Sequence, residues 1–309
     1  GTEATTQWGP VSSATQPNGV SIYPAWKNIS EHVHILKFDV DYETDTARLT
    51  DSFRGEWYSL GTARQNDAFY QLDAAALATT AATEKQTHFQ GANAFHLEKQ
   101  LTDWWFASGG YLYSHLDSDA SVDVTTAIPA TLTAPLAAPG WSANGIELER
   151  DSHVFSLSTL FGPWEGLTLS LGTQNEWTRQ TGLGRANVTF ALPGSPIIPL
   201  GQEDFFSDYD RSTFTQEAGL RFTKIPFTTL FAEGRLQQEN IGQTEDIDGG
   251  LTPYLAQTDA KSRLKDLRAG FNTSPWRRVM LSAQYRHYDN RSEYPNSFKT
   301  AGGGPYEGY

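Results

Sequence analysis

The chain has 309 residues, a formal net charge of −13 and no cysteine. The acidic balance argues against a nucleic-acid partner, because no basic stripe is present to neutralise phosphates. Without cysteine the chain holds no disulfide, no thiolate metal site and no haem attached through CxxCH. No run of about 18 or more apolar residues is present, so the sequence predicts no transmembrane helix.

Aromatic residues are unusually frequent for a chain of this hydrophobicity. They make up 13% of the residues, while all hydrophobic residues together reach 38%. This combination is unfavourable for a packed soluble globule. It is typical of a transmembrane β-barrel, whose outer face is apolar, whose lumen is polar and whose rims carry aromatic side chains.

Residues 1–31 are punctuated by glycine and proline, and we expect a long irregular loop there, with or without a short strand near residues 20–23. From residue 32 onward one unit recurs, in which two alternating strands flank a short turn. The predicted hairpins cover residues 32–60, 88–116, 152–179, 212–240 and 264–290. Their turns are expected at residues 43–46, 99–103, 162–166, 224–227 and 272–276.

The clearest unit is the last one. Leu267, Ala269 and Phe271 alternate with polar residues before the predicted turn, and Leu281 and Tyr285 belong to the alternation after it. We expect these apolar side chains to face lipid. A charge placed at Leu281 should then cost about 2–4 kcal/mol if the site lies near the midplane of the bilayer.

Polar stretches separate the hairpins, and we expect them to be long external loops. They cover residues 61–84, 117–146, 181–211 and 241–260. Outer-membrane barrels show the same asymmetry, with short periplasmic turns and longer extracellular loops. The predicted fold is therefore an all-β, transmembrane, antiparallel up-and-down β-barrel of about ten strands, which forms a single region over residues 1–309. A soluble β-solenoid or sandwich is the alternative.

The first predicted strand runs into a short turn, and the last predicted strand runs out of one. If the short turns are periplasmic, both ends of these residues lie on the extracellular side, whereas complete barrels of this class normally keep both ends in the periplasm. We therefore expect the chain to be part of a larger barrel. The alternative is that edge strands within residues 1–31 and 291–309 escape detection.

Charged side chains of both signs fall on the polar face of the predicted strands. In an open pore they would tune ion selectivity, and in a filled lumen they would bind a partner. The predicted lumen-facing residues are Arg48, Arg54, Glu56, Glu217, Arg221, Glu233, Arg235, Arg268 and Arg286. Large aromatic residues near the turns are expected to form a girdle at the membrane interface. These are Trp104, Trp105, Trp164, Phe227 and Trp276.

No catalytic motif of the GxSxG, HExxH or P-loop type is present, so we predict that the chain is not an enzyme. We also predict no metal site and no cofactor in this chain. His32 and His34 would share a strand face, and acidic residues alternate over residues 39–45, but the glycine and glutamate of a calcium loop are missing. Acidic runs near residues 117–123 and 203–210 fit solvated loops better than calcium sites.

The segment Tyr285-Arg286-His287-Tyr288-Asp289-Asn290-Arg291-Ser292 and the repeated hairpins resemble the decahaem-associated outer-membrane barrels of the MtrB/PioB type. The resemblance extends over most of the chain in style, with this one short motif. It implies a large barrel that sheaths a multihaem c-type cytochrome, so that electrons cross the outer membrane through the partner's haems. The chain departs from the family in its shorter length and in lacking the cysteine pair of some members, and no functional residue is carried over.

Two functions follow as expectations. The first is a porin-like sheath or scaffold in the bacterial outer membrane, with haem in a cytochrome partner and with the lipid bilayer and lipopolysaccharide around it. The alternative is a diffusion porin or transporter barrel for small solutes. Haem that co-purifies with the barrel would distinguish the two.

Overall fold

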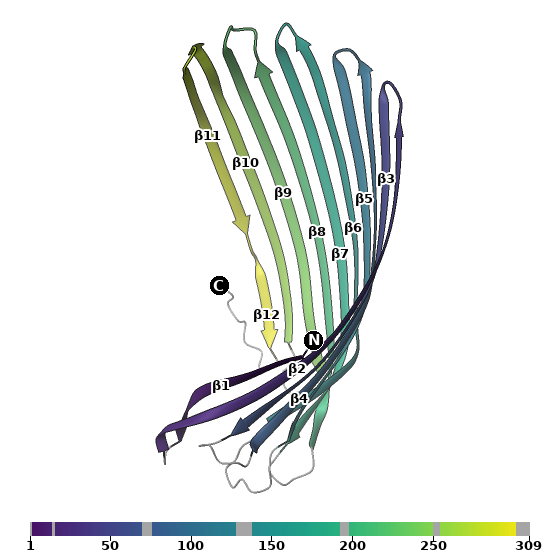
Figure 1. Ribbon diagram of the computed structural model, residues 1–309, viewed down its shortest axis with the longest axis vertical. Coiled ribbons are helices and arrows are strands. Elements are labelled where there is room, and N and C mark those ends of the chain that lie inside the picture. Colours follow the sequence, from purple (N-terminus) through teal and green to yellow (C-terminus); the bar gives the residue numbers. More distant parts are fainter. Residues whose placement is uncertain are drawn as a thin grey trace.

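The computed structural model (Figure 1) is one curved antiparallel sheet of twelve strands. The structure describes residues 2–13, 16–69, 76–127, 138–191, 198–249 and 254–300. Strands that follow one another in the chain are neighbours in the sheet from β1 to β11, and β12 pairs with part of β10. The strands are β1 (Thr2–Ser13), β2 (Gln16–Glu43), β3 (Ala47–Phe69), β4 (Ala76–Thr102), β5 (Trp105–Ala127), β6 (Ala138–Trp164), β7 (Leu167–Ala191), β8 (Ile198–Phe222), β9 (Thr228–Gly249), β10 (Tyr254–Trp276), β11 (Val279–Glu293) and β12 (Asn296–Thr300).

The prediction of an all-β, antiparallel up-and-down fold is confirmed. Within the described ranges no helix is long and apolar enough to cross a membrane. The sheet bends along its length and across its strands, so that it forms a trough (Figure 1). No pairing between β1 and β11 closes this trough among the described residues.

Short turns join β2–β3, β4–β5, β6–β7, β8–β9 and β10–β11 at one end of the sheet, at the top of Figure 1. Three of the predicted turns are confirmed in position. In the β6–β7 turn, Glu165 and Gly166 have φ of 47° and 88°. Two successive positive φ values are those of a type I′ turn, which matches the twist of the flanking strands.

Two predicted turns are displaced along the chain. The β4–β5 turn is at residues 103–104, and the β10–β11 turn is at residues 277–278, after Pro275 and not at it. Pro275 lies in an irregular stretch of β10, where the pairing register shifts between Thr273 and Trp276. A proline is tolerated there because a bulge needs no donor from it.

The predicted strand lengths and loops are wrong over much of the chain. Strands β2 to β10 have 22 to 28 residues each, against the roughly ten expected from the span of a bilayer. The expected loops at 61–84, 117–146, 181–211 and 241–260 are mostly strand, and only residues 70–75, 128–137, 192–197 and 250–253 lie outside the described part. These stretches lack a clear alternation of apolar and polar residues, so the sequence pattern does not reveal them.

The ends of the chain also differ from the main expectation. Residues 1–31 contain β1 and the first part of β2, and β12 lies within residues 291–309. The alternative of undetected edge strands is therefore confirmed for both segments. Residues 301–309 lie outside the described residues.

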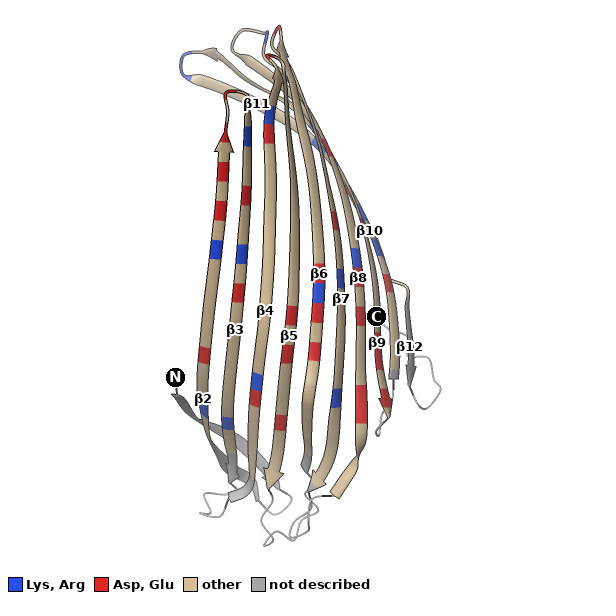
Figure 2. Ribbon diagram, turned by 90° about the vertical axis from the view of Figure 1, so that its right-hand side faces the viewer, with Lys and Arg blue, Asp and Glu red and all other residues tan. Residues whose placement is uncertain are grey.

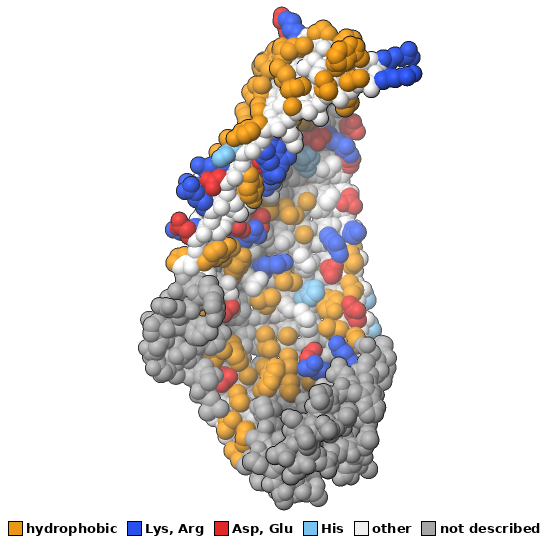
Figure 3. All heavy atoms as spheres, turned by 90° about the vertical axis from the view of Figure 1, so that its left-hand side faces the viewer, with side chains coloured by type: hydrophobic (Ala, Val, Ile, Leu, Met, Phe, Trp, Pro, Cys, Tyr) orange, Lys and Arg blue, Asp and Glu red, His pale blue; other side chains and the backbone are white. Residues whose placement is uncertain are grey.

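The register of the strands assigns each position to one of two faces, because directly paired residues of neighbouring strands share a face. Apart from glycine, the buried residues of the described part all fall on one of them. They are Thr62, Ala82, Ser118, Ala143, Ala186, Thr215, Ala260 and Asp266. We call this the inner face, which is the hollowed side seen in Figure 3, and the opposite side the outer face.

Candidate functional site: the two faces of the curved sheet

The outer face carries a band of apolar side chains next to the short turns. We call it the outer belt. Its larger members are Leu36, Phe38, Leu49, Phe53, Trp57, Phe89, Phe95, Tyr111, Phe155, Leu157, Leu169, Leu171, Leu220, Phe222, Leu230, Leu267, Phe271, Leu281 and Tyr285. Asp51 interrupts it, paired with Val40 and Phe95.

Farther from the short turns, ionisable residues join apolar ones such as Leu183 and Phe206 on the outer face. The ionisable outward residues there are His115, Asp117, Glu149, Asp151, Arg179, Asp208, Asp210, Lys261, Arg263, Lys265, Asp289 and Arg291. The change comes about ten residues from the turns. Ten residues at ~3.3 Å each, on strands tilted by ~40°, give a belt about 25 Å tall, the height of the apolar band of an outer-membrane barrel.

The predicted lumen-facing residues all lie on the inner face. Pairing connects most of them: Glu217 is opposite Arg235. Glu233 is opposite Arg268, and Arg268 is opposite Arg286. Charged residues of both signs are spread along the strands (Figure 2), and the register separates those of the inner face from those beyond the belt. That these side chains line a lumen stays a prediction.

Asp266 holds together the inner face of the last hairpin. Its carboxylate accepts hydrogen bonds from Arg286 Nε at 2.8 Å and Nη2 at 2.9 Å, and from Arg268 Nη2 at 3.0 Å. Arg286 also stacks its guanidinium 5.1 Å from the centroid of the Tyr288 ring. Asp266 is 9% exposed and separates two arginines that face each other across β10 and β11. It is absent from the predicted set, although its spacing of two from Arg268 places it on the same face.

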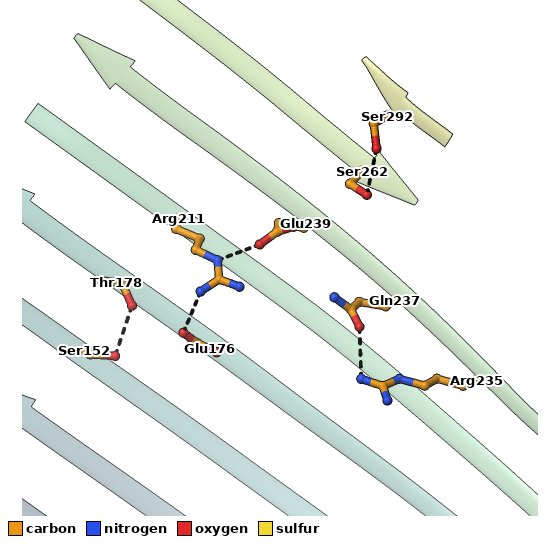
Figure 4. Close-up of polar contacts among 9 residues, drawn as sticks. All are labelled: Ser152, Glu176, Thr178, Arg211, Arg235, Gln237, Glu239, Ser262 and Ser292. Carbon is orange, nitrogen blue, oxygen red and sulfur yellow. Dashed lines mark hydrogen bonds and ion pairs between the residues drawn. The ribbon is translucent and has the colours of Figure 1, made fainter. Parts of the chain in front are cut away.

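A second network crosses three strands (Figure 4). Arg211 on β8 donates from Nε to Glu239 on β9 at 2.6 Å, and from Nη1 to Glu176 on β7 at 3.3 Å. Nearby, Arg235 donates to Gln237 at 3.0 Å and lies 3.6 Å from Glu217. None of Arg211, Glu176 and Glu239 belongs to the predicted set, because their partners become apparent only once the register of the strands is known.

The same pairing of charges occurs at the other side of the trough. Arg48 contacts Asp41 at 2.7 Å, and Arg54 contacts Glu56 at 2.5 Å. His88 Nε2 lies 3.9 Å from Glu56. The inner face therefore satisfies much of its charge internally, and acids and bases alternate along it. Water can wet such a surface, and its charges do not produce an electrostatic potential of a single sign.

Beyond the level of the outer belt, the inner face includes an apolar patch. A hollow of about 630 Å³ lies there, formed by β4 to β9. The side chains on the inner face that line it include Trp141, Ile146, Leu148, Phe205 and Ile247. Trp141, Ile146, Phe205 and Ile247 fall in stretches that were expected to be loops, so the sequence predicts no apolar surface here. Beyond the belt, both faces therefore carry apolar and charged residues.

The predicted girdle residues lie at the end of the sheet that carries the short turns. Trp104 packs against Trp105 and Trp164, with ring centroids 6.2 and 5.6 Å apart, and Phe161 stacks on Trp105 at 5.7 Å. Phe227 and Trp276 are 76% and 66% exposed on neighbouring turns. Their position agrees with a girdle, and their contact with a membrane interface stays a prediction.

One cluster with metal-ligand chemistry occurs just beyond the belt on the outer face. His115, Glu149 and Asp151 bring ligand atoms within 4.8 Å of one another. The Asp151 carboxylate already accepts hydrogen bonds from the His115 ring at 2.9 Å and from Tyr113 at 2.8 Å. The hydrogen bond from His115, followed by that from Tyr113, lowers the pKa of Asp151 despite partial burial. These contacts account for the cluster without an ion.

Comparison with known proteins gives little beyond the fold. No family model matches the chain, and no curated protein matches it. A solved structure with some likeness is the siderophore receptor PiuA from Acinetobacter baumannii, at 11% sequence identity and a TM-score of 0.25. The likeness covers 94% of this chain and 63% of the receptor, so the chain spans less than two thirds of that protein. A similarity this weak supports no argument about function.

Proposed function

We propose that the chain forms part of the wall of a porin-like β-barrel in the bacterial outer membrane. The outer belt carries this proposal. A soluble sheet would bury such a surface against a second layer, whereas the described residues form one layer with the belt exposed. Leu157, Leu171 and Leu281, for example, are 47%, 42% and 49% exposed. A lipid environment explains why apolar residues face outward and charged residues face inward.

The asymmetry of the belt orients the wall. On one side it ends at the short turns, and on the other the strands continue for about ten or more residues with charged outward positions, the arrangement of short periplasmic turns and an extended extracellular part. In lipid, the backbone groups along the outer edge of β11 need partners. We therefore propose that further strands pair with this edge and complete a closed barrel.

What fills the lumen is the finer part of the proposal. The apolar hollow around Ile146, Leu148 and Phe205 favours a lumen that is occupied at this level, because an open aqueous pore gains nothing from such a surface. A protein partner that presents apolar residues would bury it. On this basis we propose a non-enzymatic sheath for a protein partner. The resemblance carried by residues 285–292 makes a multihaem cytochrome in transmembrane electron transfer the proposed partner, and the alternative is a diffusion porin or transporter for small solutes.

Two measurements on the protein purified in detergent test the barrel and the content of its lumen separately. Heat-modifiable gel migration and β-rich circular dichroism are expected if a barrel is present, and a monodisperse protein in plain buffer would contradict it. Haem absorbance that co-purifies with the barrel from its native host is expected for the sheath. A haem-free preparation that conducts small solutes in planar bilayers would instead establish the alternative.

A further inference from the structure

Four cations gather on the outer face of β10 and β11, just beyond the outer belt. Lys261, Arg263 and Lys265 occupy alternate outward positions of β10, and all three are exposed. Arg291 on β11 is directly opposite Arg263. We call these four residues the outer cationic cluster. Leu267 is the next outward residue of β10 after Lys265, and it begins the apolar surface of the belt.

The cluster is not neutralised by its own protein. Two carboxylates face it across β11, since Asp289 is opposite Lys265 and Glu293 is opposite Lys261. Only Asp289 forms an ion pair there among the described residues, at 3.5 Å from Arg291 Nε. Asp259 is the next outward residue of β10 after Lys261, so four cations against three acids leave a net charge of +1.

Arg263 faces a like charge across the hairpin. Among the described residues it has no hydrogen bond and no ion pair, and the group directly opposite it is another arginine. Like charges directly opposite each other destabilise a sheet, unless an anion lies between them. Arg179 offers a contrast at a similar level of the outer face, because it lies 3.8 and 4.0 Å from the carboxylates of Asp208 and Asp210.

The position of the cluster indicates which anion it would bind. Leu236 on β9 is directly opposite Lys265, and Leu267 and Ala269 follow on β10 toward the short turns, so an apolar surface adjoins the cluster. A molecule that uses both surfaces must carry an anionic head and apolar chains. Arginine and lysine recognise phosphate through charge-assisted hydrogen bonds, and paired guanidinium groups suit an anion with several oxygens.

We propose that the outer cationic cluster binds the phosphate groups of a phosphorylated lipid of the outer leaflet, with its acyl chains along the belt beside Leu267. This inference rests on the proposed function, since it needs the belt to lie in a bilayer. The bound phosphate relieves the repulsion between Arg263 and Arg291, and it fixes the orientation of β10 and β11 relative to the membrane surface. The protein then carries specific lipid in a defined place.

Titration of the detergent-solubilised protein with diphosphorylated lipid A, followed by native mass spectrometry, tests the inference. The matched ligand is the same glycolipid without its phosphates. The variant Arg263→Gln/Arg291→Gln should bind the diphosphorylated lipid at least about tenfold more weakly, as expected when two cations near a membrane surface are removed. The control Arg179→Gln removes one outward arginine that has its own carboxylates, and it should bind as the unchanged protein does.

The other outcomes of this titration contradict either the lipid site or the proposed barrel. Equal binding of the phosphorylated and dephosphorylated lipids, or no effect of the double variant, overturns the inference. Competition by millimolar inorganic phosphate that abolishes lipid binding would show a site for free phosphate instead of a lipid site. Heat-modifiable gel migration of the same samples is measured first. If the unchanged protein does not show it, the proposal that the chain forms a barrel is contradicted. If only the double variant fails to show heat-modifiable migration, the single variant Lys265→Gln is used instead. It should weaken binding of the diphosphorylated lipid severalfold.

Discussion

Replacing Leu157 by arginine is expected to lower the free energy of unfolding in lipid by about 2–4 kcal/mol. Leu157 lies in the middle of the outer belt on β6, with strands on both sides, and its side chain is 47% exposed. In the proposed barrel the new guanidinium would point into hydrocarbon. Urea unfolding of the protein folded into lipid vesicles measures the change.

The adjacent residue supplies the matched control. Ser158 lies on the inner face opposite Ser108 and Gly172, beside a hollow of about 380 Å³ that admits a longer side chain. Ser158→Arg should therefore cost far less than Leu157→Arg. Equal costs at the two positions, or a larger cost at Ser158, would mean that the assignment of the faces is reversed. Leu281→Arg tests the same point on the last hairpin.

Replacing Arg211 by leucine should cost about 1–3 kcal/mol of stability, the range of hydrogen bonds to charged groups. The substitution leaves Glu176 and Glu239 without their shared cation, and these side chains are only 25% and 21% exposed. Because the Arg211 side chain is itself 34% exposed, solvent screening places the expected loss in the lower half of that range. Urea unfolding measures this loss in the free energy of unfolding.

A double-mutant cycle isolates the interaction from the loss of side-chain volume. Arg211→Leu combined with Glu239→Gln should be less destabilised than the sum of the single variants, since the pair is removed together. Arg185→Leu serves as a control, because its ion pair with Asp204 is on the exposed outer face and its loss should not be measurable. Strict additivity of Arg211 and Glu239 would mean that their 2.6 Å contact contributes nothing.

The sequence predicts the hairpins because alternation is strong where one face of the sheet is apolar and the other polar. One such pattern sets Leu267, Ala269 and Phe271 against Asp266 and Arg268, and the structure places the two sets on opposite faces of the sheet. Beyond the belt both faces are mixed, as in the acidic run of β8 between Glu203 and Asp210. Backbone pairing continues through these residues, but side-chain periodicity no longer reports it.

The charged residues of the inner face could be predicted in part for the same reason. Arg268 and Arg286 stand out as charged positions inside an alternating strand. Their shared acceptor Asp266, and the triad centred on Arg211, depend on which residues of neighbouring strands are opposite each other. That register is set over the whole sheet, so no single stretch of sequence contains it. The sequence does not predict the apolar hollow, because the stretches of strand that form it lack a clear alternation of apolar and polar residues.

The central claim is that the outer belt faces lipid, and the chain is well suited to a direct test because it contains no cysteine. Single cysteines along β6, each labelled with a fluorophore, can be examined in vesicles that contain brominated lipids. Quenching is expected at Phe155 and Leu157, absent at Ser156 and Ser158, and absent at Asp151 beyond the belt. Equal quenching at successive residues, or quenching that is strongest at Ser156 and Ser158, would contradict the proposed membrane wall.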